Sequence, residues 1–394
     1  NQALAPVAVT GGKAFTTLVA GWGHTCGLTA TGAAWCWGYN YFGQLGDGTF
    51  DQSWPQGKTT PVAVTGGKTF TSLVAGYQHT CGLTTTGAAW CWGWNNAGQL
   101  GNGQPIQPTE PVVVSGGKAF TTLVAGSYHT CGLTATGAAW CWGYNYYGQL
   151  GDGTTNTTNT PVAITGGKAF TSLATGSQHT CGLTASGAAW CWGNNGNGQL
   201  GDGTFDQGWP PNKTTPVAVT GGKAFTTLAA GSSHTCGLTA SGAAWCWGNN
   251  GNGQLGSEIG SQALSPIAVG GTLPTVTPTA TRVAQPMPSE YASIAKGYAH
   301  TCGLSLSGTA WCWGDNASGQ IGDGTTTASL SPVYVSGGKA FTALVAGSNH
   351  TCGLTATGAA WCWGANGSGQ LGDGTANGGA TTVPVAVTGD KTFT

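Results

Sequence analysis

The chain has 394 residues, of which 6% are charged, and its formal net charge is −1. A typical globular domain has roughly 25% charged residues, and a nearly neutral chain offers no basic surface for nucleic acid or an anionic membrane. No apolar run approaches the ~18 residues of a membrane-spanning helix. The chain begins at Asn1 without an apolar leader, so we expect a mature or trimmed form from which any signal peptide has been removed.

One stretch of sequence recurs seven times with small changes; its first copy is His24-Thr-Cys-Gly-Leu-Thr-Ala-Thr-Gly-Ala-Ala-Trp-Cys-Trp-Gly38. The copies begin at His24, His79, His129, His179, His234, His300 and His350. A period near 50 residues is typical of repeat architectures. We therefore predict a single domain, residues 1–394, with repeats at about 11–64, 65–114, 115–164, 165–219, 220–269, 289–335 and 336–387.

Each repeat contains the signals of four short strands. In the first repeat, Phe15–Ala20 is rich in β-branched residues, and His24–Thr29 and Ala33–Trp37 flank a glycine-containing turn. The remaining strand is a Pro-Val-Ala-Val segment bounded by turn residues, which stands before the first unit at Pro6–Val9 and recurs at Pro61–Val64, where the cycle starts again. Four strands in each of seven repeats, with no helical pattern, predict an all-β, seven-bladed β-propeller with four-stranded blades.

The 14 cysteines occur as one pair per repeat. A three-residue hairpin loop that ends at Gly32 places Cys26 opposite Cys36, where Cβ atoms lie about 4.5–5.5 Å apart. We therefore predict one cross-strand disulfide per blade: Cys26–Cys36, Cys81–Cys91, Cys131–Cys141, Cys181–Cys191, Cys236–Cys246, Cys302–Cys312 and Cys352–Cys362. Free thiols are one alternative, and a zinc site with His24 is another, although it would supply only three ligands. Disulfides predict a secreted or cell-surface protein.

Three motifs of the repeat carry a family resemblance: His24-Thr-Cys-Gly-Leu-Thr29, Trp37-Gly-Tyr-Asn40 and Gly43-Gln-Leu-Gly46. They resemble the regulator of chromosome condensation repeat family, and the match covers all seven repeats. The resemblance implies a seven-bladed propeller of four-stranded blades. The paired cysteines are similar to a bacterial, exported variety of these repeats, and exported members can be pure binding proteins. The family founder's nucleotide exchange and chromatin binding need surface features that this sequence does not show.

Three insertions interrupt the regular repeat. The segments 50–60 and 205–215 copy each other, and each holds a tryptophan, Trp54 or Trp209, that is either part of a copied loop or an aromatic contact point. The Pro/Thr-rich segment 271–288 is expected to be an exposed insertion loop, with O-glycosylation candidates at Thr275, Thr277 and Thr279. Sequons give N-glycosylation candidates at Asn156, Asn212, Asn316 and Asn366.

The termini hold one strand more than seven blades need. Both Pro6–Val9 and Pro384–Val387 copy the fourth strand, so one completes the last blade and the other is surplus, as is the tail 388–394. A surplus strand can pair with an exposed sheet edge on another molecule. The sequence therefore allows self-association through the terminal strands.

No catalytic or metal-binding constellation stands out. All seven histidines lie in the repeat, so we expect them to be structural, hydrogen-bonded to a neighbouring loop. Asp47 and its equivalents lie in Gly-Asp-Gly-Thr turns, where turn formation explains them. We predict no enzymatic activity, no cofactor and no metal.

Aromatic residues gather in loop positions of repeats one to three, where repeats four, five and seven have Ser, Asn or Gly. These candidate binding residues are Trp22, Tyr39, Tyr41, Phe42, Tyr77, Trp94, Tyr128, Tyr144, Tyr146 and Tyr147. Ordinary variation in loop packing is the alternative. An exposed aromatic cluster favours an interaction surface.

Two non-enzymatic functions follow. In the first, the protein is an extracellular structural protein that self-associates into a fibre, lattice or coat through its terminal strands and loop faces. In the second, it is a secreted or cell-surface module that binds a protein or a glycan through the aromatic loops of blades one to three.

Overall fold

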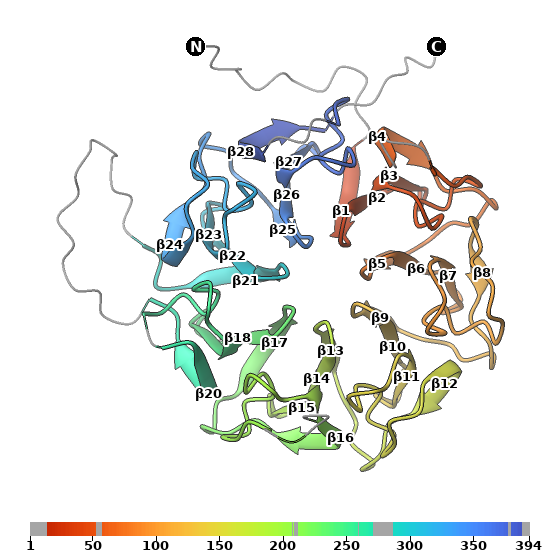
Figure 1. Ribbon diagram of the computed structural model, residues 1–394, viewed down its shortest axis with the longest axis horizontal. Coiled ribbons are helices and arrows are strands. Elements are labelled where there is room, and N and C mark those ends of the chain that lie inside the picture. Colours follow the sequence, from red (N-terminus) through yellow and green to blue (C-terminus); the bar gives the residue numbers. More distant parts are fainter. Residues whose placement is uncertain are drawn as a thin grey trace.

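The computed structural model describes residues 14–52, 57–206, 208, 212–258, 260–270, 287–376 and 380–387. Within these residues, 28 strands form seven four-stranded antiparallel sheets that are arranged radially as the blades of a propeller (Figure 1). The predicted all-β, seven-bladed propeller is therefore confirmed. The same residues contain no helix long and apolar enough to cross a membrane.

Each blade is built from one continuous stretch of chain, with its first strand nearest the propeller axis and its fourth strand outermost (Figure 1). Blade one consists of β1 (Phe15–Ala20), β2 (His24–Thr29), β3 (Ala34–Tyr39) and β4 (Gly57–Ala63). The other strands are, in blade two, β5 (Ser72–Ala75), β6 (His79–Leu83), β7 (Ala89–Gly93) and β8 (Val112–Val113); in blade three, β9 (Thr122–Ala125), β10 (His129–Leu133), β11 (Ala139–Gly143) and β12 (Thr158–Ala163); in blade four, β13 (Ser172–Thr175), β14 (His179–Leu183), β15 (Ala189–Asn194) and β16 (Asn212–Ala218); in blade five, β17 (Phe225–Ala230), β18 (His234–Thr239), β19 (Ala244–Asn249) and β20 (Gln262–Ala268); in blade six, β21 (Tyr291–Lys296), β22 (His300–Ser305), β23 (Ala310–Gly314) and β24 (Ser329–Tyr334); and in blade seven, β25 (Ala343–Ala346), β26 (His350–Leu354), β27 (Ala360–Ala365) and β28 (Ala380–Ala386).

The central hairpin of each blade has the register that the sequence predicts. Cys26 pairs with Cys36 and Gly27 pairs with Trp35, and the turn residue Gly32 adopts a φ of +79° that favours glycine. All seven predicted disulfides are present, with Cα–Cα distances of 4.0–4.1 Å. Because every cysteine is disulfide-bonded, both the free-thiol and the zinc alternatives are wrong.

Neighbouring blades pack face to face. The disulfide face of blade one, with Cys26 and Leu28, lies against Phe70 and Trp92 of blade two, and all four side chains are buried. The equivalent tryptophan is fully buried in every blade: Trp37, Trp92, Trp142, Trp192, Trp247, Trp313 and Trp363. The hydrophobic core is therefore divided among the spaces between the blades, and each sheet is apolar on both faces.

A buried polar network links each blade to the next. In the first pair of blades, the backbone oxygen of Gln44 accepts a hydrogen bond from Thr80 Oγ1 at 2.9 Å and another from Trp92 Nε1 at 3.0 Å. Thr80 Oγ1 in turn lies 2.9 Å from His24 Nε2. Since the threonine hydroxyl donates to the carbonyl, His24 Nε2 must donate to the hydroxyl. We call this arrangement the His–Thr–Gln–Trp network.

The His–Thr–Gln–Trp network recurs at all seven blade interfaces. Its His–Thr distances are 2.9–3.0 Å throughout. The histidines are thus structural, as expected, but their partner is a strand residue of the next blade and not a loop. Burial lowers the pKa of six of these histidines to about 3 and that of His350 to about 4. They are therefore neutral at physiological pH.

Within the described residues, blades seven and one meet without sharing a sheet. β28, which contains the segment Pro384–Ala386, pairs with β27 and completes blade seven. The junction has the same network, because Thr25 and Trp37 both donate to the backbone oxygen of Gln370 at 3.1 Å. The other terminal segment, Pro6–Val9, and the tail 388–394 lie outside the described residues.

Removal of one disulfide tests the covalent part of this architecture. The double variant Cys131→Ala/Cys141→Ala is expected to lower the free energy of unfolding by about 2–3 kcal/mol, because the bond closes a short loop. Denaturant unfolding of the oxidised protein measures the difference. Full reduction of the unaltered protein should lower its unfolding temperature further, and an unchanged temperature would show that the disulfides do not stabilise the fold.

The buried histidines predict that acid destabilises the protein. Above pH 6.5 the imidazoles are neutral in both the folded and the unfolded protein. Below pH 6.5 the histidines of the unfolded chain become protonated, whereas those of the folded protein stay neutral until the pH approaches about 3. The free energy of unfolding should therefore decrease as the pH is lowered below 6.5, by up to about 1.4 kcal/mol per pH unit for each histidine. Urea unfolding between pH 7 and pH 5.5 measures this slope.

A single-histidine variant provides the control for this pH dependence. His129→Gln should be less stable at pH 7, because its network is broken, but should show a shallower slope, since one fewer group titrates. A free energy of unfolding that does not change with pH over this range would contradict the assignment.

Candidate functional site

The aromatic candidates lie in two sets of loops on one face of the propeller. In an antiparallel blade, the loop after the first strand and the loop after the third strand emerge at the same edge, whereas the hairpin between the second and third strands emerges at the opposite edge. Trp22, Tyr77 and Tyr128 follow the first strand of their blades. The other seven end the third strand or follow it: Tyr39, Tyr41, Phe42, Trp94, Tyr144, Tyr146 and Tyr147.

All ten rings belong to one continuous network of contacts, which we call the aromatic surface. Around the propeller axis, Trp22 stacks on Tyr77 at 5.1 Å between ring centroids, Tyr77 contacts Tyr128 at 5.5 Å, and Tyr128 contacts Tyr144 at 6.3 Å. Two contacts further out bridge the blades: Phe42 to Trp94 at 6.2 Å, and Trp94 to Tyr128 at 5.0 Å. The structure thus brings together all ten candidate binding residues of repeats one to three.

The rings of the aromatic surface are partly buried against one another and partly open to solvent. Tyr41 and Tyr146 are the most exposed, at 38% and 39%. Burial raises the pKa of Tyr39, Tyr77 and Tyr128 above its usual value, so these phenols stay protonated as hydrogen-bond donors at neutral pH. The rings therefore pack on one another and leave part of their surface open to solvent.

Blades four to six present polar side chains at the same positions, and blade seven has an alanine. Where blades one to three have Tyr39, Trp94 and Tyr144, the later blades have Asn194, Asn249, Asp315 and Ala365. Asn249 Nδ2 donates to Asn197 Oδ1 of the neighbouring blade at 3.0 Å, in a place where the earlier blades have ring contacts. The face is therefore divided into an aromatic half and a polar half.

A cavity of about 360 Å³ opens at the centre of this face, where the aromatic and polar halves meet. Its lining includes Trp22, Tyr77 and Tyr128 from the aromatic surface and, from other blades, Ser232 and Ser348. Next to this cavity, Lys296 lines a narrower pocket on the propeller axis. Lys296 also lines a second cavity of about 270 Å³, whose other lining residues are mainly valine, leucine, isoleucine and alanine. The propeller axis is thus a channel with a polar, aromatic mouth and an apolar opposite end.

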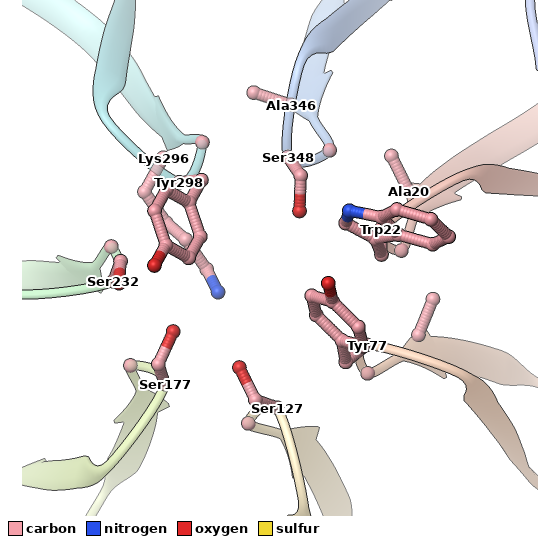
Figure 2. A pocket seen from close by; sticks show the side chains of 18 of the residues that line it. Ala20, Trp22, Tyr77, Ser127, Ser177, Ser232, Lys296, Tyr298, Ala346 and Ser348 are labelled. Atoms are coloured by element: carbon pink, nitrogen blue, oxygen red, sulfur yellow. The ribbon is translucent and has the colours of Figure 1, made fainter. Parts of the chain in front are cut away.

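Two residues of this channel, Tyr298 and Lys296 of blade six, were not among the predicted binding residues. Tyr298 is 50% exposed and lies across the channel mouth from Tyr77 (Figure 2). Its position in the repeat is that of Trp22 and Tyr77, so alignment of all seven repeats would have identified it. Lys296 occupies a position that is alanine in five blades. That departure is visible in the sequence, but its place inside a channel is not.

The glycosylation candidates fall into three groups. Asn156 is exposed, and Asn212 is half-buried at the start of β16. Asn316 and Asn366 are buried, and each Nδ2 donates to the aspartate of its own turn, Asp323 at 3.3 Å or Asp373 at 3.1 Å. These two predictions are wrong, because the amide nitrogen that would receive a glycan is enclosed and already bonded. Thr275, Thr277 and Thr279 lie outside the described residues.

The copied insertions have the same described contacts. An ion pair joins Lys58 to Asp51 at 2.8 Å in blade one, and its copy joins Lys213 to Asp206 at 3.0 Å in blade four. Trp54 and Trp209, the two candidate aromatic contact points, lie outside the described residues.

The polar loop residues that recur from repeat to repeat have structural hydrogen-bond partners. Asp47 Oδ1 accepts hydrogen bonds from the backbone nitrogen and hydroxyl of Thr49, which agrees with the turn role expected for it. Asn40 Oδ1 accepts from the backbone nitrogen of Leu45, so the loop after β3 is held internally. Among the described residues, no group of three or more His, Cys, Asp or Glu side chains is arranged to hold a metal ion.

The propeller resembles solved structures of low sequence identity. Prp20p from Saccharomyces cerevisiae aligns with a TM-score of 0.78 and 22% identity over 91% of this chain and 87% of that chain. Human WBSCR16 aligns with a TM-score of 0.73 and 21% identity over 86% of each chain. At these identities the likeness shows a shared fold.

Curated relatives match in sequence over shorter stretches. The ultraviolet-B receptor UVR8 of Arabidopsis thaliana is 33% identical over 101 residues, which are 25% of this chain and 22% of the receptor. The probable E3 ubiquitin-protein ligase HERC3 of Homo sapiens is 33% identical over 131 residues, 30% of this chain and 11% of the ligase. The matched stretches thus span less than a quarter of these relatives.

Family models account for most of the chain. The RCC1-like domain matches residues 2–284, more than half of the sequence. Models of the regulator of chromosome condensation (RCC1) repeat match residues 291–320, 341–370 and 307–354. The fold and these matches agree with the resemblance seen in the repeat motifs, and the protein therefore belongs to the family of RCC1-like domains.

Proposed function

We propose that the protein is a non-enzymatic binding module that recognises another protein through the aromatic surface. The observation that carries the proposal is the continuous contact network of ten rings across blades one to three, which the described residues of blades four to seven do not repeat. A structural role in the fold would be shared by all seven blades, as the His–Thr–Gln–Trp network is. The asymmetry therefore favours a ligand.

The composition of the aromatic surface suits a protein partner. Tyrosine and tryptophan dominate the residues that contribute most binding energy in protein interfaces. They supply large contact areas at a low cost in side-chain entropy, and here the rings already hold one another in place. A fold relative also has protein partners, since the solved structure of Prp20p is presented with its binding properties to Gsp1p and histones.

We assign no catalytic role because the histidines and the repeated aspartates are engaged in structural hydrogen bonds. Each histidine is buried and neutral and donates its Nε2 proton within the His–Thr–Gln–Trp network, so none is a free general base. The repeated aspartates hold turns. We further propose that the module works outside the cell, because seven disulfides are typical of proteins in oxidising compartments.

The alternative of self-association into a fibre, lattice or coat stays a prediction. One of its two candidate strands, Pro384–Ala386, is paired within blade seven through β28 and is therefore not a surplus strand. The other, Pro6–Val9, lies outside the described residues. Light scattering of the unreduced protein decides this point directly, since a binding module of this type is expected to stay at its monomer size.

A screen with matched variants tests the proposed function. The intact, oxidised protein is immobilised and offered to arrays of extracellular proteins and of glycans, and each ligand found is titrated. Trp94→Ala and Tyr146→Ala should each weaken binding of the protein partner ten- to a hundredfold, roughly 1–3 kcal/mol for a residue central to an interface. The unfolding temperature of each variant is measured in parallel.

The control is an exposed apolar residue on the other face. Leu306 is 73% exposed in the β22–β23 hairpin, and Leu306→Ala should leave binding unchanged. A partner that binds all three variants equally well would contradict the assignment to the aromatic surface. Binding by glycans alone would show that the ligand class is wrong.

A further inference from the structure

Lys296 is the only charged side chain among the described residues that line the central channel. It ends β21, the innermost strand of blade six. The equivalent positions hold alanine in five blades and Thr175 in blade four. A charge in this place does not follow from the repeat, and therefore needs its own explanation.

The ammonium group of Lys296 is only partly satisfied within the described residues. Its Nζ donates to the backbone oxygen of Thr175 across the channel at 3.1 Å. An ammonium has three donors, so two remain for a ligand, and the ion pairs of the described residues involve other lysines. Burial lowers the pKa of Lys296 to about 8, which still leaves it mostly protonated at neutral pH. A half-satisfied charge in a confined site is costly unless something binds it.

Hydroxyl groups at the channel mouth line the same pocket as Lys296, which lies just inside the mouth. The side chains of Ser127, Ser177 and Ser348 point toward the axis, with the phenol of Tyr77 on one side and the Lys296 ammonium between them (Figure 2). The cavity of about 360 Å³ lies on the same side and opens between the rings of the aromatic surface. The opposite end of the channel is apolar, so a polar ligand enters through the mouth.

We propose that the channel mouth is a carboxylate-binding site, in which the Lys296 ammonium and the hydroxyls of Ser127, Ser177 and Ser348 hold the acidic group of a ligand. One cation suits a group with a single negative charge, and two ammonium protons with converging hydroxyls match two carboxylate oxygens. A phosphate dianion would need more positive charge than the described lining offers.

The source of the carboxylate links this site to the aromatic surface. Trp22, Tyr77 and Tyr128 line the mouth cavity, and Trp22 and Tyr77 also line the adjoining pocket that contains Lys296. A protein docked on the aromatic surface would therefore present an aspartate or glutamate side chain to the channel, an assignment that rests on the proposed function. A free small carboxylate would use the same groups.

Titration with acetate tests the site without any knowledge of the partner. The Cε resonance of Lys296 in carbon-13-lysine-labelled protein is assigned by its loss in Lys296→Ala and followed by NMR as acetate replaces chloride at constant ionic strength. The resonance should shift with saturation in the millimolar range, and its pKa should rise, because an anion stabilises the protonated form. Lys68, which lies over the ring of Trp90 and does not line the channel, should not respond.

Two peptide arms distinguish the sources of the carboxylate. N-acetyl-Gly-Asp-Gly-amide should shift Lys296 as acetate does if the mouth admits an acidic side chain, whereas the matched Gly-Asn-Gly peptide should not. Binding of acetate alone would assign the site to a small free carboxylate. If neither acetate nor the aspartate peptide produces a saturable shift, the proposal is overturned.

Two variants separate loss of the site from loss of the fold. Lys296→Ala restores the residue found in five other blades, so it should abolish the acetate-dependent stabilisation against heat while raising the unfolding temperature in chloride. Ser127→Ala with Ser177→Ala should weaken acetate binding severalfold while the lysine remains. A fall in the unfolding temperature of Lys296→Ala in chloride would show that the charge serves the fold and would overturn the proposal.

The carboxylate-binding site and the proposed function can be disproved separately. Trp94→Ala does not touch the lysine and should leave the acetate response unchanged, even though it weakens partner binding. If acetate binds but Trp94→Ala does not weaken the binding of any partner, the channel site is supported and the proposed docking surface is contradicted. Partner binding that depends on Trp94 without any response of Lys296 to carboxylates would do the reverse.

Discussion

The backbone oxygen of one glutamine per blade is the acceptor on which the whole ring depends. It lies in the loop after the third strand, and it receives a threonine hydroxyl and a tryptophan indole from the next blade, as Gln44 does from Thr80 and Trp92. The histidine of the first blade completes the network by donating to the same threonine. Within the described residues, these directed bonds accompany the apolar packing between blades, and they fix how one sheet sits on the next.

The same network joins blade seven to blade one, so this junction has the contacts that hold adjacent blades elsewhere in the ring. Thr25 bonds to residues 325 and 345 positions away in the sequence with the same geometry that adjacent blades use. The disulfides act at another level, since each joins two strands of one hairpin within a single blade. Covalent bonds thus stabilise the blades, and hydrogen bonds with apolar packing stabilise the ring. The neutrality of the histidines is a consequence, because a charged imidazole could not be accommodated at a fully buried interface.

A scaffold of nearly identical repeats makes departures informative. The residues shared by all blades form the His–Thr–Gln–Trp network, the disulfides and the loop turns, and their role is therefore structural. The residues that differ between blades are the ones to which we assign ligand binding: the rings of the aromatic surface in blades one to three, and Tyr298 and Lys296 in blade six. Their loops meet around one channel mouth because the antiparallel order of each blade brings the same two loops to the same face.

The sequence by itself determined the features that arise within one repeat. Strand order, hairpin register and disulfide pairing follow from residues ten positions apart, where a glycine turn leaves one pairing available. The aromatic cluster was also predictable, because equivalent positions in neighbouring blades must be neighbours in space. Only the tertiary structure decided what depends on contacts between distant segments. Lys296 meets Thr175 across 121 positions, and Asn316 and Asn366, which match a glycosylation pattern locally, are enclosed in the folded loops. A sequence pattern records chemical type and spacing, whereas burial and the convergence of side chains on one cavity are set by how the seven blades pack.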